Sequence, residues 1–272
     1  YLFAHHLAGR YRAKLVLSGR SSPNAESERK LEELRALGAD VLYVSADIAD
    51  ADQVRDLIAS AKAQFGPLNG VLHSAGVNRD SLLIRKDRDS LRQVLAPKVQ
   101  GILHLDRATA EEPLDLFVLF SSGAGSFGNP GQTDYAYANA FMDAFSEHRE
   151  SMRARRERFG KTLSIAWPFW LEGGMQVSAA DLQRTEERSG LCALPTDIGI
   201  SYWETLLRSD STRALALYGY PSKIAAYCDP SAVPAADAKP QSGAIDLETL
   251  RTRTRQYLCG LVHNETRLPV DL

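Results

Sequence analysis

Three polar residues between positions 122 and 139 have a spacing that suits hydride chemistry at a carbonyl group. Ser122 ends the apolar run LDLFVLFSS, and Tyr135 follows thirteen residues later, near the start of a helical pattern. Asn139 comes one helical turn after Tyr135, so these two side chains share a helix face. One hydroxyl can hold a carbonyl oxygen while the other donates a proton to the developing alkoxide. These residues predict an active site for carbonyl reduction.

The stretch between the serine and the tyrosine contains a literal G-x-G-x-x-G, formed by Gly123, Gly125 and Gly128. A dinucleotide-binding loop of this pattern joins a strand to the immediate start of a helix, with an acidic residue about twenty positions later. Here GNPGQ follows instead of a helix, and Asp143, which has roughly that spacing, lies within a helical pattern. We interpret the match as accidental and expect the glycines to let the stretch fold back, bringing the two hydroxyls together.

Short apolar segments alternate with helical patterns along the chain. The segments at residues 14–20, 40–48, 68–77, 114–122 and 161–170 read as strands, separated by amphipathic stretches of ten or more residues. This alternation predicts an α/β fold, a doubly wound, Rossmann-like parallel sheet. The strands are nearly all apolar, as expected when helices cover both faces of the sheet. Ligands on such sheets bind beyond the carboxyl ends of the strands.

In order and spacing, these segments resemble the short-chain dehydrogenase/reductase superfamily and, more narrowly, the ketoreductase domains of modular polyketide synthases. The resemblance covers roughly residues 1–225 and is carried by LVLSGR, ADI, GVLHSAGV, VLAPKVQG, FVLFSS, NPGQTDYAYANAFMDAF and WPFWLEGGM. HSAGV, RDSLLIRK and WPFWLEGGM are most similar to ketoreductases of trans-acyltransferase assembly lines. The resemblance implies NADPH-dependent reduction of a 3-ketoacyl thioester. The implied partners are an acyl carrier protein, which bears the substrate on phosphopantetheine, and other domains of the same megasynthase.

The resemblance implies four catalytic residues. Ordinary superfamily members carry Tyr-x-x-x-Lys, and Asn139 stands in the place of that lysine, as in the ketoreductases, which makes Lys98 of APKVQG the candidate. Tyr135 would be the general acid, Ser122 would orient the ketone oxygen, and Asn139 would support the network. Lys98 would assist the tyrosine, since a nearby ammonium favours the phenolate, and would contact the nicotinamide ribose. His73 reads as a core histidine rather than a base.

The implied cofactor-binding residues follow the predicted strands. Arg20 ends the segment KLVLSGR, where an arginine can accommodate the 2′-phosphate of NADPH; an ordinary surface arginine in a turn is the alternative. The other residues are Asp47 and Ile48 beside the adenine, Ser74, Ala75 and Gly76 close to the cofactor, and Trp167 and Pro168 beside the nicotinamide. For Asp47, a turn or helix-capping role is the alternative.

Three residues are implied to face the substrate. In the family, a subset that gives D-configured 3-hydroxyls has an Asp closing the loop after the AGV strand, and Asp80 matches it. The usual Leu-Asp-Asp is only partly kept, as Asn78-Arg79-Asp80. The other subset has a Trp eight residues before the catalytic tyrosine, a position held here by Phe127. Met175 of WPFWLEGGM completes this group. The resemblance therefore implies a D-configured product.

Composition excludes several classes of function. The net charge is -2 and 24% of the 272 residues are charged, which gives no electrostatic reason to expect nucleic acid or an anionic membrane as a partner. No apolar run is long enough to span a bilayer, and no signal-peptide pattern opens the chain. Cys192, Cys228 and Cys259 are scattered, so neither disulfides nor a metal site is predicted. A reducing, cytoplasmic location fits.

The chain reads as one catalytic domain with an appendage. We expect residues 1–228 to form the ketoreductase domain, N-terminally truncated because the first strand and Gly-rich loop would lie upstream of Tyr1. Residues 229–245 read as a linker, and residues 246–272 as a C-terminal helical appendage that resembles the beginning of an acyl carrier domain. A terminal helix packing on the reductase is the alternative. Two other functions stay open: a catalytically silent structural or docking module, and a free-standing short-chain dehydrogenase.

Overall fold

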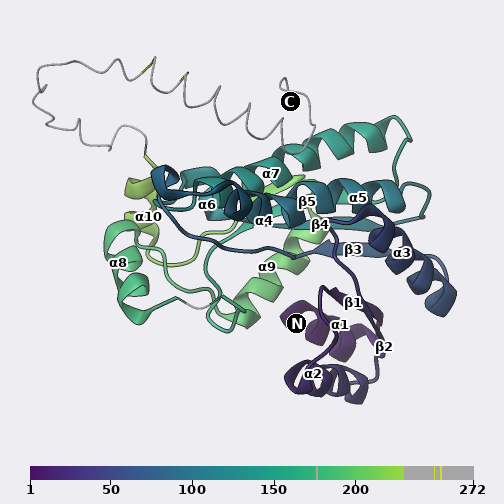
Figure 1. The fold of residues 1–272 in the computed structure, drawn as a ribbon. Coiled ribbons are helices and arrows are strands. Elements are labelled where there is room, and N and C mark those ends of the chain that lie inside the picture. The colour runs from purple at the N-terminus through teal and green to yellow at the C-terminus, as the bar shows by residue number, and fades with distance from the viewer. Residues whose placement is uncertain (176, 230–247, 249–251, 253–272) are drawn as a thin grey trace, which may run out of the picture.

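The computed structural model describes residues 1–175 and 177–229, together with residues 248 and 252 (Figure 1). The predicted linker and carrier segments, residues 229–245 and 246–272, therefore fall almost wholly outside the described residues. Within the described ranges, strands and helices alternate, and every strand pairing is parallel. The prediction of an α/β fold with parallel strands is confirmed.

The strands are β1 (Lys14–Gly19), β2 (Asp40–Ser45), β3 (Gly70–His73), β4 (Leu116–Ser122), β5 (Lys161–Trp167) and β6 (Arg213–Leu215). The sequence patterns predict the first five of these strands. They do not predict β6, because three residues are too few to show a period. The strands form two sheets, one with the order β1-β2 and one with the order β3-β4-β5-β6.

The helices are α1 (Leu2–Tyr11), α2 (Ala25–Ala36), α3 (Ala51–Phe65), α4 (Arg88–Lys98), α5 (Gln100–Ala108), α6 (Gly123–Phe127), α7 (Thr133–Ala154), α8 (Ala179–Ser189), α9 (Thr196–Arg208) and α10 (Pro221–Cys228), with a 3-10 turn, η1 (Leu83–Arg85). No helix in the described part of the chain combines the length and the apolar character needed to cross a membrane.

β1 of the two-stranded sheet and β3 of the four-stranded sheet do not hydrogen-bond to each other. Among the described residues, β1 pairs only with β2, and β3 pairs only with β4. β1 and β3 therefore each keep one edge without a backbone partner. Helix α3 links the sheets, because it contacts β1 and β2 while its Val54 and Ile58 pack with Val71 of β3. No described strand pairs with both β1 and β3, so the parallel strands are divided between two sheets.

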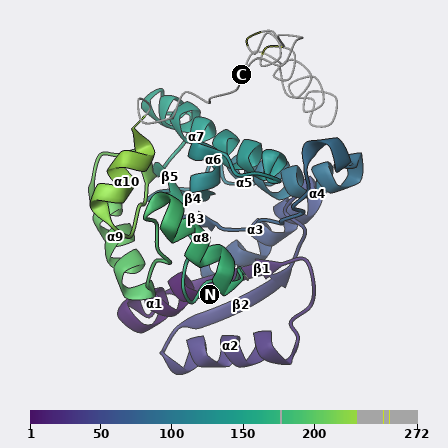
Figure 2. The same cartoon turned by 90° about the vertical axis from the view of Figure 1, so that its left-hand side faces the viewer.

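Helices cover both faces of the four-stranded sheet (Figures 1 and 2). Phe117 and Leu119 of β4 are fully buried in a core cluster with residues of α3, α5 and α7. Val118, which points to the opposite face, lies in a second cluster with Trp203 of α9, against which Phe3 of α1 packs. The near-continuous apolar pattern of β4 follows from this double cover, because both faces of the strand are buried.

A buried arginine joins the middle of α7 to α5 and to the start of β5. Arg149 has no exposed surface, and its Nε donates to Asp106 Oδ1 at 2.8 Å. Its two terminal nitrogens donate to Thr162 Oγ1 at 2.9 Å and to the backbone oxygen of Phe159 at 2.9 Å. Its guanidinium carbon also lies 4.3 Å from the centroid of the Phe117 ring. This side chain therefore helps to fix where α7 sits on the sheet.

We expect Arg149→Met to lower the free energy of unfolding by about 3 kcal/mol, because it removes one of the two arginines paired with the buried Asp106 and leaves the oxygens of Thr162 and Phe159 without this donor. Urea unfolding followed by circular dichroism measures this loss. Arg155→Met is the matched control: its ion pair with Glu157 is exposed, so we expect a change within about 0.5 kcal/mol. Equal losses in the two variants would contradict the role of the buried arginine.

Candidate active site

Lys98, the last residue of α4, is buried beside β4. Helix α4 starts at Asp87, whose side chain accepts a hydrogen bond from the backbone of Ser90, and it packs against α7. Only 3% of Lys98 is exposed, and its Nζ donates to the backbone oxygen of Phe120 at 3.0 Å. Lys98 is therefore not a solvated residue of the helix surface.

The ammonium of Lys98 lies in a tight, weakly polar space. Burial lowers the pKa of Lys98 to about 7, and the carboxylate of Asp143 acts in the opposite direction. A Cβ atom at Gly76 would lie 2.9 Å from Lys98 Cε, so a side chain at this position would displace the end of the lysine. The site holds a lysine whose charge changes near neutral pH.

Tyr135 lies beside this lysine, and the side chains of Ser122 and Asn139 lie beside Tyr135. Lys98 Nζ is 5.7 Å from the centroid of the Tyr135 ring. Tyr135 is 8% exposed, and Asn139 is fully buried with its Nδ2 donating to the Tyr135 backbone oxygen at 2.7 Å. Ser122 caps α6 by accepting from the backbone of Ala124 at 3.3 Å. The structure thus brings together the four residues that sequence reasoning placed in the catalytic centre.

The pKa of Tyr135 is raised, chiefly because the phenol is buried. Hydrogen bonding to the side chains of Ser122 and Asn139 acts in the other direction, and the negative charge of Asp80 adds to the rise. The sequence predicts a tyrosine whose phenolate is favoured by the nearby ammonium, whereas the pKa of Tyr135 is raised here, mainly by burial. Tyr135 therefore keeps its proton at neutral pH, which suits a proton donor.

Asp143 is a residue of this site that the sequence reasoning missed. It is 7% exposed, and its Oδ1 accepts from Ser164 Oγ of β5 at 2.6 Å. Burial raises the pKa of Asp143, while Ser164 and the charge of Lys98 act to lower it. A signal was present: Tyr135, Asn139 and Asp143 follow one another at four-residue steps, which places them on one helix face. Asp143 is the counter-charge of the buried lysine.

The glycine-rich stretch packs two helices together. Contrary to expectation, a short helix, α6, follows β4 directly before GNPGQ begins. A Cβ atom at Gly125 would lie 3.0 Å from the backbone nitrogen of Ala140 and 3.1 Å from Cβ of Asn139. Glycine at this position therefore lets α6 rest directly on α7. This contact accounts for Gly125 without a bound phosphate.

Asp80 and Phe127, two of the three residues predicted to face the substrate, contact different partners. Asp80 is exposed, and its Oδ2 accepts a hydrogen bond from Gln132 Nε2 at 2.8 Å. Gln132 lies three residues before Tyr135. Phe127 is 37% exposed and its ring centroid is 5.6 Å from that of Tyr227 on α10. Met175 is 46% exposed. Of the three, Asp80 is tied by a hydrogen bond to the start of α7.

The residues predicted beside the adenosine follow β1 and β2. Arg20 is exposed just after β1 and forms no side-chain ion pair within the described ranges. Asp47 Oδ1 accepts from the backbone of Ala49 at 2.9 Å, so the turn role weighed in the sequence is present. The side chain of Ile48 packs against the core cluster that includes α3 and α5. Unlike Asp47 and Ile48, Arg20 has a side chain that forms no hydrogen bond or ion pair and joins no core cluster among the described residues.

The residues predicted nearer the nicotinamide follow β3 and β5. Ser74, Ala75 and Gly76 are exposed just beyond β3. Trp167 is 6% exposed, and its ring centroid is 4.9 Å from that of Trp170 within the aromatic core. Pro168 is half-buried. His73, at the end of β3, is buried, and burial lowers its pKa to about 3, so it is neutral at physiological pH and is no base.

The residues of the site fit the ribose end of a nicotinamide cofactor and a carbonyl group. The hydroxyls of Ser122 and Tyr135 and the ammonium of Lys98 are hydrogen-bond donors gathered beyond β3 and β4. The buried Oδ1 of Asn139 has no hydrogen-bond partner among the described residues and can accept one. Nothing in the described part of the chain groups three or more His, Cys, Asp or Glu side chains in a way that could hold a metal ion.

Comparison with known proteins identifies the family. Residues 1–172 match the family model of the KR domain. Polyketide synthase PksL of Bacillus subtilis strain 168 is 37% identical over 99% of this chain. The chain belongs to the ketoreductase (KR) domains of polyketide synthases. Members of this family are nicotinamide-dependent reductases. Polyketide synthase ThaG of Burkholderia thailandensis is 40% identical over 96% of the KR chain.

Solved structures agree with this assignment. A ketoreductase domain from the bacillaene assembly line matches with a TM-score of 0.81 and 44% identity, covering 82% of the KR chain and 54% of that chain. An N-terminal ketoreductase from the macrolactin assembly line matches with a TM-score of 0.75 and 41% identity, over 83% of the KR chain and 43% of that chain. The KR chain spans 6% of the length of PksL and 5% of ThaG.

Proposed function

We propose that this ketoreductase domain reduces a 3-ketoacyl thioester to the 3-hydroxyacyl thioester, with NADPH as the reductant. The substrate is held by an acyl carrier protein of a polyketide synthase of the trans-acyltransferase type. One observation carries the proposal: a buried lysine, Lys98, lies 5.7 Å from the ring centroid of a buried, protonated tyrosine, Tyr135. A solvated surface offers no such pair, because burial is what brings the pKa of the lysine close to neutral.

The chain's own residues supply the proton and the binding contacts. The hydride that adds to the ketone carbon comes from the nicotinamide cofactor. Tyr135 donates its phenolic proton to the ketone oxygen, so that the carbonyl becomes an alcohol. Ser122 donates a hydrogen bond to the same oxygen and stabilises the negative charge that develops there. Lys98 stabilises the phenolate left on Tyr135 by its positive charge, which is strongest below about pH 7.

The proposal includes a D-configured 3-hydroxyl. Its support is Asp80, which occupies the position of the family's stereochemical Asp. The hydrogen bond from Gln132 holds Asp80 close to the start of the helix that carries Tyr135. Phe127 at the position of the alternative subset's Trp agrees with this choice, because the Trp that marks that subset is missing.

The direct test supplies the synthase polypeptide that carries this chain with NADPH and a 3-ketoacyl pantetheine thioester. We expect NADPH oxidation at 340 nm and a 3-hydroxy product of D configuration by chiral chromatography. Arg20→Ala should raise the KM for NADPH about tenfold and leave that for NADH unchanged, because only NADPH carries the 2′-phosphate that the arginine would bind. Reduction with NADH only, or an L-configured product, would contradict the corresponding part of the proposal.

A further inference from the structure

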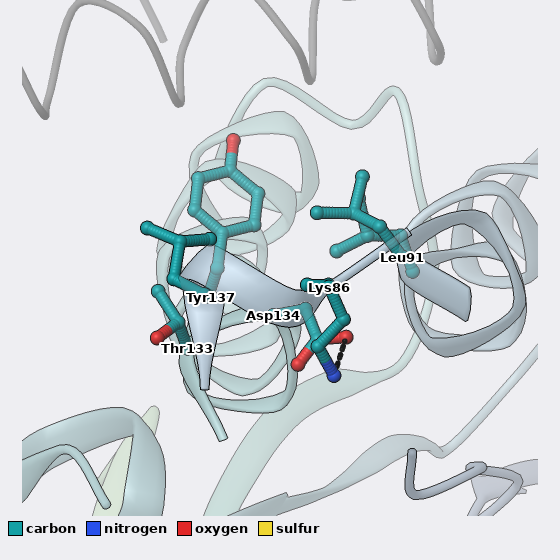
Figure 3. A pocket seen from close by; sticks show the side chains of 7 residues that line it. Lys86, Leu91, Thr133, Asp134 and Tyr137 are labelled. Carbon is teal, nitrogen blue, oxygen red and sulfur yellow. Dashed lines mark ion pairs between the residues drawn. The ribbon is translucent and has the colours of Figure 1, made fainter. Parts of the chain in front are cut away.

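The segment between β3 and α4 is joined to the start of α7 at points beyond the hydrogen bond to Asp80 described above. The backbone nitrogen of Ser81 donates to the backbone oxygen of Gly131 at 2.9 Å. Lys86 Nζ and Asp134 Oδ2 form an ion pair at 2.9 Å, drawn as a dashed line in Figure 3. A segment far away in the sequence is thus attached to the first turn of the catalytic helix.

The ion pair between Lys86 and Asp134 is shielded from water. Both side chains are 2% exposed. The pocket around the pair is lined by Leu83, Leu91, Leu95, Thr133 and Tyr137 (Figure 3). In such surroundings the attraction between the charges is stronger than at a surface. Loss of one partner leaves the other charge buried and uncompensated, so the pair can hold its two segments firmly.

The carboxylate of Asp134 connects Lys86 to the catalytic tyrosine. Its Oδ1 accepts from the backbone nitrogen of Tyr135 at 3.0 Å. Its Oδ2 has no hydrogen bond of good geometry and relies on the charge of Lys86. Lys86 Nζ also donates to the backbone oxygen of Arg79, beside Asp80. One lysine therefore contacts both the segment that carries Asp80 and the residue that precedes Tyr135.

We propose that Lys86 is a positioning residue for the reduction. Through its ion pair with Asp134, Lys86 holds residues 78–86 at a fixed place relative to Tyr135. It thereby determines which face of the ketone meets the proton donor. Lys86 does not touch the reacting atoms and acts only through Asp134 and the segment. This inference rests on the proposed function, because it takes Tyr135 as the proton donor.

The test replaces Lys86 with methionine in the full synthase polypeptide. We expect kcat to fall about tenfold and the fraction of the minor 3-hydroxy isomer to rise about fivefold, with the KM for NADPH unchanged. Hydrogen exchange supplies a readout apart from activity. The amide of Ser81 should exchange about tenfold faster, because its bond to Gly131 opens once the segment is released. Unchanged exchange and an unchanged isomer ratio would overturn the proposal.

A double variant separates positioning from stability. Lys86→Met with Asp134→Leu replaces the buried pair by apolar side chains and should restore the melting temperature. If the isomer ratio stays altered in this stable protein, the pair positions the segment. If both the melting temperature and the isomer ratio return to wild-type values, the pair is merely structural and the proposal fails.

Lys62→Met is the control away from the site: Lys62 of α3 is 49% exposed, and it pairs with Glu112, a carboxylate that is 6% exposed. We expect its kcat and isomer ratio to equal those of the wild type. The wild-type protein is measured beside the variants. Absence of ketone reduction in the wild type would count against the proposed function, whereas the exchange of the Ser81 amide would still decide whether Lys86 holds the segment.

Discussion

Tyr135→Phe is expected to lower the kcat for ketone reduction by about 10²–10⁴-fold, because the variant lacks the proton that the alkoxide must receive. The raised pKa of Tyr135 means that the wild-type phenol is protonated and ready to donate at neutral pH. Stopped-flow or steady-state oxidation of NADPH with a 3-ketoacyl pantetheine thioester measures the loss. Removing one oxygen atom from a helix this well packed should leave the fold intact.

Tyr202→Phe provides the matched control for this experiment. Tyr202 lies on α9 and packs against the core cluster that contains Trp167 and Trp203. Burial raises the pKa of its phenol as well. We expect its kcat to equal that of the wild type. A Tyr135→Phe protein that folds normally and reduces the ketone at the wild-type rate would show that another group supplies the proton, and the catalytic assignment would be wrong.

Lys98→Met is expected to lower kcat about 10²-fold while making the protein more stable at neutral pH. Burial lowers the pKa of Lys98 from the ordinary lysine value of 10.5 to about 7. Between these two values the unfolded chain binds the proton that the folded chain gives up, so stability rises with pH across this range. Methionine has no such proton to lose. Two losses act against this gain, the bond to Phe120 and the positive charge beside the buried Asp143, so the variant should gain about 1 kcal/mol of unfolding free energy at pH 7.

The gain in stability should shrink as the pH approaches 10.5, which urea unfolding at several pH values can follow. In the wild type, the rate of reduction should fall as the pH rises through about 7, because Lys98 loses its charge there. Lys161→Met is the control, since Lys161 is a half-buried lysine that donates to the Leu206 backbone oxygen at 3.0 Å away from the site. It should keep full activity. A Lys98→Met protein that is less stable than wild type at pH 7 would contradict the burial argument.

Much of the fold could be predicted from the sequence because apolar runs mark strands that are buried on both faces. The run at residues 114–122 became β4 (Leu116–Ser122), and Tyr135, expected near the start of a helix, lies in the first turn of α7 (Thr133–Ala154). The sequence patterns indicate the strands but not their pairing, since hydrogen bonding between strand edges depends on which strands are neighbours in space.

The site was predictable where its residues share a short stretch of sequence. Ser122, Tyr135 and Asn139 lie within eighteen positions, and their spacing alone indicated hydride chemistry. Lys98 came from the family resemblance, because nothing local shows that the end of α4 meets β4. The pair of Lys86 and Asp134 joins segments that approach one another only in the folded chain, so no periodicity could have pointed to it.

The hydrogen bond from Ser164 to Asp143 has a practical meaning for anyone who wishes to redesign this enzyme. On the proposed mechanism, the acidity range in which the catalyst works is tuned from inside β5, by a hydroxyl that no acyl chain can reach. Replacing Ser164 would remove a hydrogen bond that lowers the pKa of Asp143. The negative charge of Asp143, which raises the pKa of Lys98, would in turn be less favoured. The working range could therefore be moved without reshaping the entrance through which different ketones are chosen.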